Sequence, residues 1–252
     1  MTDFSEFRRA IVVGASSGIG EALARELAAA GGRVALVARR KSELDRIARA
    51  IRESGKGEAY AHPHDVANFS EVPELFDKIV EELGGLDIII YAAGVMPEVV
   101  EGEYNFAKDR QMVDVNLLGA MAWFNPSAAF FEAQRHGTIA GISSIAGERG
   151  RRGNPAYCTT KAALSTYLES LRNRLARYGV NVVTVKPGFV DTVMTKGKKG
   201  LFWLISPEQA ATYTLDLVRQ GSGADGFIPA RWGLVAWVVR NIPSFVFRKM
   251  NF

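Results

Sequence analysis

Short apolar runs alternate with helical patterns along most of this chain. The runs fall at 10–13, 33–37, 58–62, 86–91, 137–143 and 181–186, with a short last one at 226–229. Helical patterns lie between them, at about 18–30, 42–54, 70–83, 105–133, 155–178 and 206–220. This alternation is typical of parallel strands joined by crossover helices. The sequence therefore predicts an α/β fold with one doubly wound parallel β-sheet and helices on both faces.

The length and composition fit one domain. A chain of 252 residues with 48% apolar and 23% charged residues can bury one substantial core, so we expect a single domain over 1–252. The first residues are too polar for a signal peptide. The single cysteine, Cys158, cannot form an internal disulfide, which favours a reducing compartment, and we expect a cytoplasmic protein. His62 and His64 have no third ligand nearby, so no metal site is predicted.

The first predicted strand runs into a glycine-rich turn and then a helix. The turn reads Gly14-Ala15-Ser16-Ser17-Gly18-Ile19-Gly20. Glycines allow a ligand to approach the backbone closely, and the N-terminus of a helix offers free N–H groups and a favourable dipole to phosphate. Strand, glycine turn and helix in this order predict a site for the pyrophosphate of a dinucleotide cofactor.

A second group of residues suits proton transfer at a carbonyl. Tyr157 and Lys161 are one helical turn apart and leave the same face of a predicted helix. A fixed ammonium stabilises a phenolate and lowers a tyrosine pKa that is ordinarily about 10. Ser144 ends the apolar run thirteen residues before Tyr157, where its hydroxyl can hydrogen-bond a substrate oxygen that gains negative charge. We predict Tyr157 as the general acid or base.

Together these motifs resemble the short-chain dehydrogenase/reductase family over about residues 8–230. The resemblance rests on the glycine turn, on Asp65 after the third run, and on Asn116, Ser144, Tyr157, Lys161 and the segment from Pro187-Gly188 to Thr192. It implies a Rossmann-type fold, a nicotinamide cofactor and hydride transfer to or from a carbonyl or alcohol carbon. It also implies catalytic roles: Lys161 holds the ribose, and Asn116 anchors a proton-relay water. The cofactor-binding residues expected on this basis are Gly14, Ser16, Ser17, Gly18, Ile19, Gly20, Arg39, Arg40, Asp65, Val66, Ala92, Ala93, Gly94, Tyr157, Lys161, Pro187, Gly188, Val190 and Thr192.

The chain departs from the family pattern after the fourth run. Tyr91-Ala92-Ala93-Gly94 stands where the family usually has Asn-Asn-Ala-Gly. Ala92 to Gly94 still allow close backbone approach, whereas the hydroxyl of Tyr91 needs a hydrogen-bond partner if it is buried.

The second run ends in Arg39 and Arg40, where an acidic residue would bind the ribose 2′-hydroxyl of NAD. Arginine suits a bidentate contact with a 2′-phosphate. We therefore predict NADP(H), with Arg39 as the main contact and Arg40 assisting, and NAD(H) as the alternative.

Cations gather in the segments expected around the mouth of the site. They are Arg149, Arg151, Arg152, Lys196, Lys198, Lys199 and Arg231. Such a rim could steer an acidic substrate, or these could be ordinary solvated loops. The net charge of +4 comes with no nucleic-acid-binding motif, so no nucleic-acid partner is predicted.

The predicted substrate lid at about 192–206 and the C-terminal extension at about 231–252 are apolar and aromatic. The lid contains Leu201-Phe-Trp-Leu-Ile205, and the extension has an uncharged run from Trp232 to Val239 before Pro243 breaks it. Three readings stay open: a subunit-interface helix in a homodimer or homotetramer, a wall of a lipophilic substrate pocket, and an interfacial membrane anchor, the least favoured of the three.

These patterns lead to one functional prediction and two alternatives. The prediction is an NADP(H)-dependent reductase or dehydrogenase whose small-molecule substrate is a hydrophobic ketone, aldehyde or alcohol. The alternatives are a reductase of 3-oxoacyl thioesters and, from another class, a cofactor-binding sensor or scaffold with little turnover.

Overall fold

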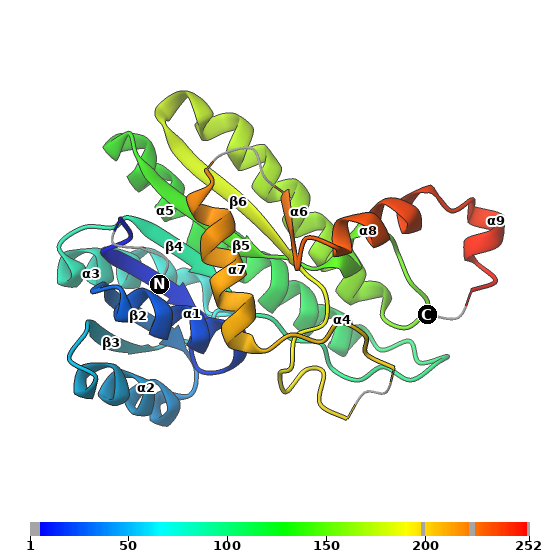
Figure 1. The fold of residues 1–252 in the computed structure, drawn as a ribbon, viewed down its shortest axis with the longest axis horizontal. Coiled ribbons are helices and arrows are strands. Elements are labelled where there is room, and N and C mark those ends of the chain that lie inside the picture. The colour runs from blue at the N-terminus through cyan, green and yellow to red at the C-terminus, as the bar shows by residue number, and fades with distance from the viewer. Residues whose placement is uncertain (1–5, 198–199, 222–224, 251–252) are drawn as a thin grey trace.

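The computed structural model describes residues 6–197, 200–221 and 225–250. Its strands form one parallel sheet in the order β3-β2-β1-β4-β5-β6-β7 (Figure 1). The doubly wound parallel sheet predicted from the alternation is confirmed. The strands are β1 Arg9–Val13, β2 Arg33–Ala38, β3 Glu58–Pro63, β4 Ile88–Tyr91, β5 Gly137–Ile142, β6 Val180–Pro187 and β7 Asp225–Ile228.

Helices cover both faces of the sheet, and each predicted helical range overlaps at least one of them. The helices α1, α2 and α7 pack on one core, and α3, α5 and α6 pack on the other. Their bounds are α1 Gly18–Ala29, α2 Lys41–Glu53, α3 Val72–Leu83, α4 Phe106–Val113, α5 Gly119–Gln134, α6 Pro155–Leu175 and α7 Pro207–Arg219. Ser206 begins α7 with the expected capping box, in which its hydroxyl accepts from the Gln209 amide.

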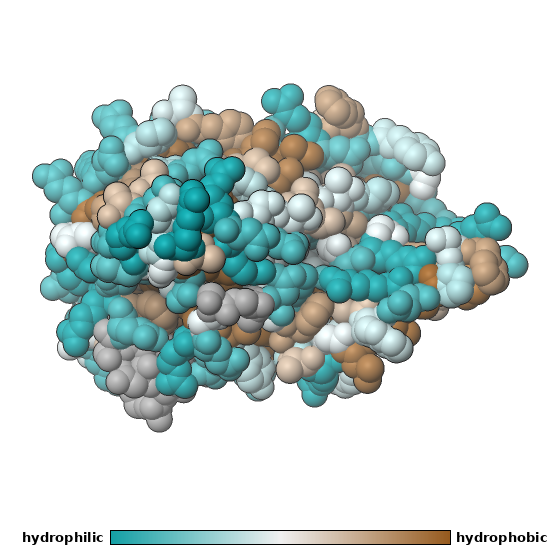
Figure 2. All heavy atoms as spheres, turned by 90° about the horizontal axis from the view of Figure 1, so that it is seen from above, coloured by the Kyte–Doolittle hydropathy of each residue, from teal (hydrophilic) through white to brown (hydrophobic). Residues whose placement is uncertain are grey.

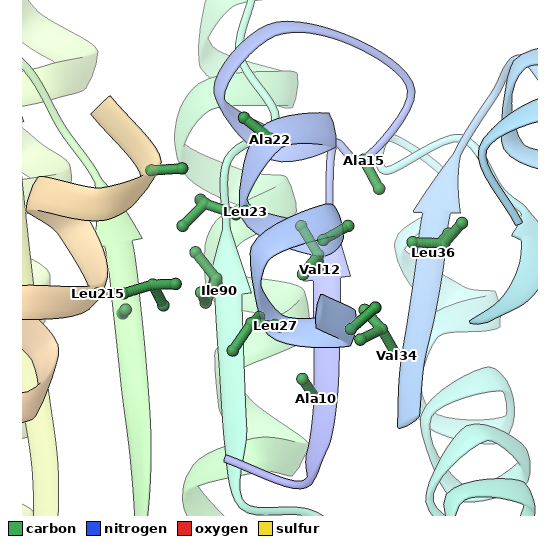
Figure 3. Close-up of a cluster of buried hydrophobic side chains, with 14 of the residues drawn as sticks. Ala10, Val12, Ala15, Ala22, Leu23, Leu27, Val34, Leu36, Ile90 and Leu215 are labelled. Carbon is green, nitrogen blue, oxygen red and sulfur yellow. The ribbon is translucent and has the colours of Figure 1, made fainter. Parts of the chain in front are cut away.

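The strands read as continuous apolar runs because both of their faces are buried. Figure 3 shows one core, in which Leu23 and Leu27 of α1 lie over Val12, Val34 and Ile90 from three neighbouring strands. Residues one position along, such as Ile11 and Ile89, face the other core. The period of two thus sends alternate side chains to opposite helical layers.

The predicted helix over 105–133 is wrong in detail. The structure divides it into α4, a π-helical segment at Asp114–Leu118, and α5. Asn116 lies in the π-helical segment and is fully buried. The backbone turn is wider there, and it carries the contacts of Tyr91 and Asn116 that are described below. The spacing of apolar residues in the sequence gives no sign of these contacts. The helix predicted to reach 178 ends at Leu175 and continues as a 3₁₀ turn at Ala176–Tyr178.

The order of strands reverses between β1 and β4. From β1 the chain moves outward through β2 to β3, and then it returns to β4 on the other side of β1. In open α/β sheets, ligands bind beyond the carboxyl ends of the strands at such a reversal. The glycine turn after Val13 and the segment after Tyr91 meet there, since Val13 and Tyr91 are paired in register.

The C-terminal extension forms two short helices, α8 Trp232–Asn241 and α9 Ser244–Phe247, which project from the body of the molecule (Figure 1). Pro243 separates them, as the sequence indicated. None of the helices in the described ranges is long and apolar enough to cross a bilayer.

Candidate active site

The glycine turn lies tight against the end of β4. Gly14 has φ +94°, and a Cβ at this position would lie 2.4 Å from the Ala93 nitrogen. A Cβ on Gly20 would lie 2.2 Å from the Gly14 carbonyl oxygen. Gly18 has φ +57°, and Thr192 lies beside it. Side chains at these positions would force the turn off the sheet edge, so the glycines build a smooth backbone cradle.

The cradle carries the donors that a phosphorylated cofactor needs. Ser17 precedes α1, but its side chain makes no capping hydrogen bond to the helix. The amides in the first turn of an α-helix lack intrahelical acceptors and point at an incoming phosphate. Arg40 donates to the hydroxyls of Ser16 at 2.9 Å and Ser17 at 2.6 Å. A phosphate group of a dinucleotide cofactor fits this donor set.

The two arginines at the end of β2 have different partners within the protein. Arg39 is largely exposed, and its guanidinium lies 3.8 Å from the carboxylate of Asp65. Arg40 instead lies over the serines of the glycine turn. A phosphate beside Ser16 and Ser17 would therefore meet Arg40 first.

The N-terminus of α6 fixes the positions of Tyr157 and Lys161. Asn154 is the N-cap and accepts from the Tyr157 amide at 3.1 Å, and Pro155 occupies the first turn. Both Tyr157 and Lys161 are buried. The Lys161 ammonium donates to the Ile142 carbonyl at 2.8 Å and lies 5.8 Å from the centre of the Tyr157 ring.

Burial sets the direction of both pKa shifts. It lowers the pKa of Lys161 from its ordinary value to about 8. Burial also raises the pKa of Tyr157, while a hydrogen bond with Ser144 and the charge of Arg151 oppose that rise. The Ser144 hydroxyl also accepts from the Ala146 amide at 3.0 Å, which holds it at the end of β5. In the protein alone, burial therefore outweighs the lowering of the Tyr157 pKa that the sequence predicted, and the phenol stays protonated near neutral pH.

Asn116 joins the loop after β4 to α6. Its side-chain oxygen accepts from the Val95 amide at 2.7 Å, and its nitrogen donates to the Val95 carbonyl at 3.0 Å. The same nitrogen donates to the Thr160 hydroxyl at 3.2 Å, and Thr160 donates to the Tyr157 carbonyl at 2.9 Å. Gly94 lies between Asn116 and Lys161, where a Cβ would be 3.5 Å and 3.6 Å from their polar atoms. The structure thus brings Asn116, Tyr157 and Lys161 to one place.

Thr160 is a member of this network that sequence reasoning missed. Its place between Tyr157 and Lys161 on one helix turn was the available signal, but threonine is common in helices and its partner lies 44 residues away along the chain. Two other expected residues are placed by their packing: Val66 is buried beside Gly119, and Ile19 packs against the core that includes α1.

Tyr91 finds the partner that its position requires. The side chain is fully buried, and its hydroxyl donates to the Val115 carbonyl at 2.6 Å. That carbonyl belongs to the π-helical segment, one residue before Asn116. A Cβ on Gly119 would lie 2.5 Å from the Tyr91 oxygen, so Gly119 leaves room for the hydroxyl. Tyr91 therefore holds the irregular turn that carries Asn116.

Replacing Tyr91 by phenylalanine should cost stability through this one hydrogen bond. The change leaves the Val115 carbonyl buried without its donor, which costs about 1–3 kcal/mol of the free energy of unfolding. Urea unfolding of Tyr91→Phe measures the loss, and Tyr213→Phe, at a half-exposed site on α7, is the control. An unchanged midpoint for Tyr91→Phe would show that the hydrogen bond contributes nothing.

The segment after β6 approaches the glycine turn and forms the base of the predicted lid. Val190 pairs with Ile205, and the Thr195 hydroxyl donates to the Val190 carbonyl at 2.6 Å. Gly188 leaves room for another side chain, because a Cβ there would lie 1.9 Å from the Trp232 indole nitrogen. The lack of a side chain at Gly188 lets α8 pack against the end of β6. Lys198 and Lys199 of the predicted rim fall outside the described residues.

A buried charge cluster ties α8 to the loop between Ser144 and Tyr157. Glu148 is almost fully buried and pairs with Lys186 at 3.0 Å and with Arg240 of α8. Lys186 pairs in turn with Asp225 at 2.6 Å. Arg149 donates to the Val239 and Ile242 carbonyls at the end of α8. Arg149 therefore holds the C-terminal extension, in contrast to the free rim position that the sequence suggested.

The sequence is similar to those of known proteins. Residues 8–200 match the family model described as short chain dehydrogenase. An uncharacterized oxidoreductase of Staphylococcus epidermidis is 34% identical over 188 residues, which cover 75% of this chain and 80% of the relative. One of Staphylococcus aureus is 36% identical over 186 residues, covering 74% of this chain and 79% of the relative.

Solved structures show the same fold. A short-chain type dehydrogenase/reductase from Mycobacterium marinum superposes with a TM-score of 0.77 at 28% identity, covering 83% of this chain and 87% of the other. A 3-oxoacyl-[acyl-carrier protein] reductase from Brucella melitensis gives 0.75 at 23% identity, covering 84% and 85%. The chain therefore belongs to the short-chain dehydrogenase family, whose members are oxidoreductases that use a nicotinamide cofactor.

Proposed function

We propose that this protein is an NADP(H)-dependent oxidoreductase that reduces a hydrophobic ketone or aldehyde, with Tyr157 as the proton donor. The observation that carries the cofactor preference is the pair of hydrogen bonds from Arg40 to Ser16 and Ser17 at the glycine turn. A guanidinium at this point favours a ribose 2′-phosphate and offers nothing comparable to a ribose with a free hydroxyl.

The residues divide the chemistry as follows. When bound at the glycine turn, NADPH would supply the hydride that the carbonyl carbon receives. Tyr157 gives its proton to the carbonyl oxygen, and the Ser144 hydroxyl hydrogen-bonds that oxygen as negative charge develops on it. The ammonium of Lys161 stabilises the phenolate that remains, because the two groups are close in a dry site. Asn116 and Thr160 link α6 to the loop after β4. This link keeps Tyr157 and Lys161 in fixed positions relative to that loop.

Aromatic rings beside the site support a hydrophobic substrate. Phe189 follows β6 and lies edge-on to Phe202 at 5.7 Å and to Trp232 at 5.3 Å between ring centres. Phe202 belongs to the predicted lid, whereas Trp232 begins α8. Rings that contact one another in this way form an apolar wall, and a small polar ketone would gain little binding free energy from contact with it.

Replacement of Arg40 tests the cofactor preference. Arg40→Ala should raise the KM for NADPH by about 10- to 100-fold, which corresponds to the loss of charge-assisted hydrogen bonds, and should leave the KM for NADH nearly unchanged. Steady-state rates with both cofactors measure this. Arg39→Ala is the matched control, because its guanidinium is exposed and faces Asp65, and it should have the smaller effect. Equal losses with both cofactors in Arg40→Ala would refute a role specific to the 2′-phosphate.

A panel of carbonyl compounds tests the substrate class. We expect kcat/KM to rise with the size of the aliphatic or aromatic group, and free carbonyls to be preferred over 3-oxoacyl thioesters. Preference for small polar ketones would contradict the hydrophobic substrate, and preference for carrier-bound thioesters would favour the thioester reductase. NADPH binding without turnover across the whole panel would favour a cofactor sensor.

A further inference from the structure

The exposed apolar residues of the C-terminal helices form a surface that the proposed chemistry does not use. Leu234 is 70% exposed, Trp237 64% and Phe245 63%. Val238 and Val246 are also exposed beside them. Exposure to this degree means that these side chains pack little against the rest of the described chain. Figure 2 shows hydrophobic and hydrophilic residues interleaved at the projecting end of the molecule, where Figure 1 places α9.

The predicted lid contributes to the same surface. Phe202, Trp203 and Leu204 are each between 42% and 50% exposed. Trp203 lies 5.4 Å from Trp232 of α8 between ring centres, and Phe202 lies 5.0 Å from it. Arg231 covers the Trp203 ring at 4.8 Å. Trp232 is itself buried, so these contacts hold the lid against the start of α8. The exposed residues of the lid and of the two C-terminal helices are here named the lid–tail surface.

The charges of these segments all have one sign. Neither 192–206 nor 226–252 contains an aspartate or a glutamate, whereas Lys196, Arg231, Arg240, Arg248 and Lys249 are cationic. A second copy of the chain docked face to face would bring like charges together. An anionic bilayer offers the complementary charge, together with an apolar interior for the aromatic and aliphatic side chains.

The lid–tail surface is held in place before any partner arrives. Arg149 donates to carbonyls at the end of α8, and its guanidinium lies 4.0 Å from the centre of the Phe247 ring. Glu148 holds Arg240 from the other side. A preformed face loses little conformational entropy on docking. The helix α8 has ten residues, which suits lying in the bilayer interface and is too short for spanning it.

From these observations we infer that the lid–tail surface docks this protein onto anionic membranes. Trp237, Leu234 and Phe245 enter the boundary between headgroups and acyl chains, and Arg248 and Lys249 lie among the anionic headgroups. The docking places the lid at the membrane surface, where a lipophilic carbonyl compound is concentrated. The membrane contact itself does not rest on the proposed function, because it requires neither cofactor nor turnover.

Vesicle co-sedimentation tests the inference directly. The full chain is mixed with vesicles of phosphatidylcholine alone, or with 30% phosphatidylglycerol, at low and high salt. We expect binding to the anionic vesicles at least tenfold tighter than to the neutral ones, and weaker at high salt. The double variant Trp237→Ser/Phe245→Ser should lose this binding, and Arg248→Gln/Lys249→Gln should weaken it about fivefold for each cation. Tyr213→Ser, a half-exposed aromatic on α7, is the control and should bind as the unchanged protein does.

Sedimentation velocity without vesicles measures the oligomeric state and so tests the alternative that this surface joins two copies of the chain. If the double variant converts an oligomer to a monomer and the unchanged protein ignores anionic vesicles, the surface is an interface between copies and the inference is overturned. Equal binding to neutral and anionic vesicles overturns it as well. An unchanged unfolding midpoint in all variants ensures that a loss of binding reports the surface and not the fold.

Discussion

Tyr157→Phe should lower kcat by about 10²- to 10⁴-fold, which is the usual contribution of a positioned general acid. The substitution removes only the hydroxyl, so the ring keeps its place on α6 and Asn154 still caps the helix. NADPH should bind to the variant with nearly unchanged affinity. Single-turnover oxidation of NADPH with a saturating ketone measures the chemical step free of product release.

The control for this experiment lies on the same helix. Tyr167 is ten residues further along α6, and its hydroxyl donates to Asn125 at 2.8 Å, outside the site. Tyr167→Phe should leave kcat within about twofold, because it makes the same chemical change without touching the reacting atoms. If both variants lose activity equally, the loss comes from α6 as a whole, and Tyr157 has no special role.

Lys161→Met should change how the stability of the protein depends on pH. Burial lowers the pKa of Lys161 in the folded protein to about 8, below its unfolded value of about 10.5. Holding this ammonium charged in the folded protein costs about 3 kcal/mol, from about 1.4 kcal/mol per pKa unit. The cost is present in full below pH 8 and vanishes as the pH rises past 10.5, because the unfolded chain binds the extra proton between these two values.

The expected result is a difference between the pH–stability curves of the unchanged protein and of Lys161→Met. From pH 7 to pH 10, the free energy of unfolding of the unchanged protein should rise by about 2 kcal/mol relative to Lys161→Met. Urea unfolding of both proteins without cofactor, in steps of half a pH unit, measures it. The buried tyrosines titrate in both proteins and cancel. Lys56→Met, at an exposed lysine, should give a curve parallel to that of the unchanged protein. A flat difference for Lys161→Met would mean that the ammonium is already well solvated in the fold.

The parts of the fold that could be predicted are those that depend on local pattern. Strands buried on both faces, such as Ile88–Tyr91, read as apolar runs, and the capping box at Ser206 marks a helix start within four residues of sequence. The irregular turn at Asn116 could not be read in this way. Its geometry depends on the Tyr91 hydroxyl, which comes from a strand 24 residues away, and the sequence shows only that this hydroxyl needs some partner.

The site shows the same division. The spacing of Tyr157 and Lys161 on one helix predicted that their side chains share a face, and the structure brings them together with Asn116. The choice between Arg39 and Arg40 depends on which way each side chain leaves the end of β2, and neighbouring positions in a sequence do not fix this. The pairing of Glu148 with Arg240 joins residues 92 positions apart and had no signal in either segment.

The ion pair of Glu148 with Arg240 has a consequence for attempts to shorten the protein. The aromatic C-terminal extension is the obvious piece to delete for higher expression or for crystals. Removing residues 231–250 would take Arg240 from Glu148 and Trp232 from the space above Gly188. It would also free the guanidinium of Arg149, in the loop that connects Ser144 to Tyr157. Single polar replacements at Trp237 and Phe245 would reduce nonspecific hydrophobic association of the protein and leave those three contacts in place.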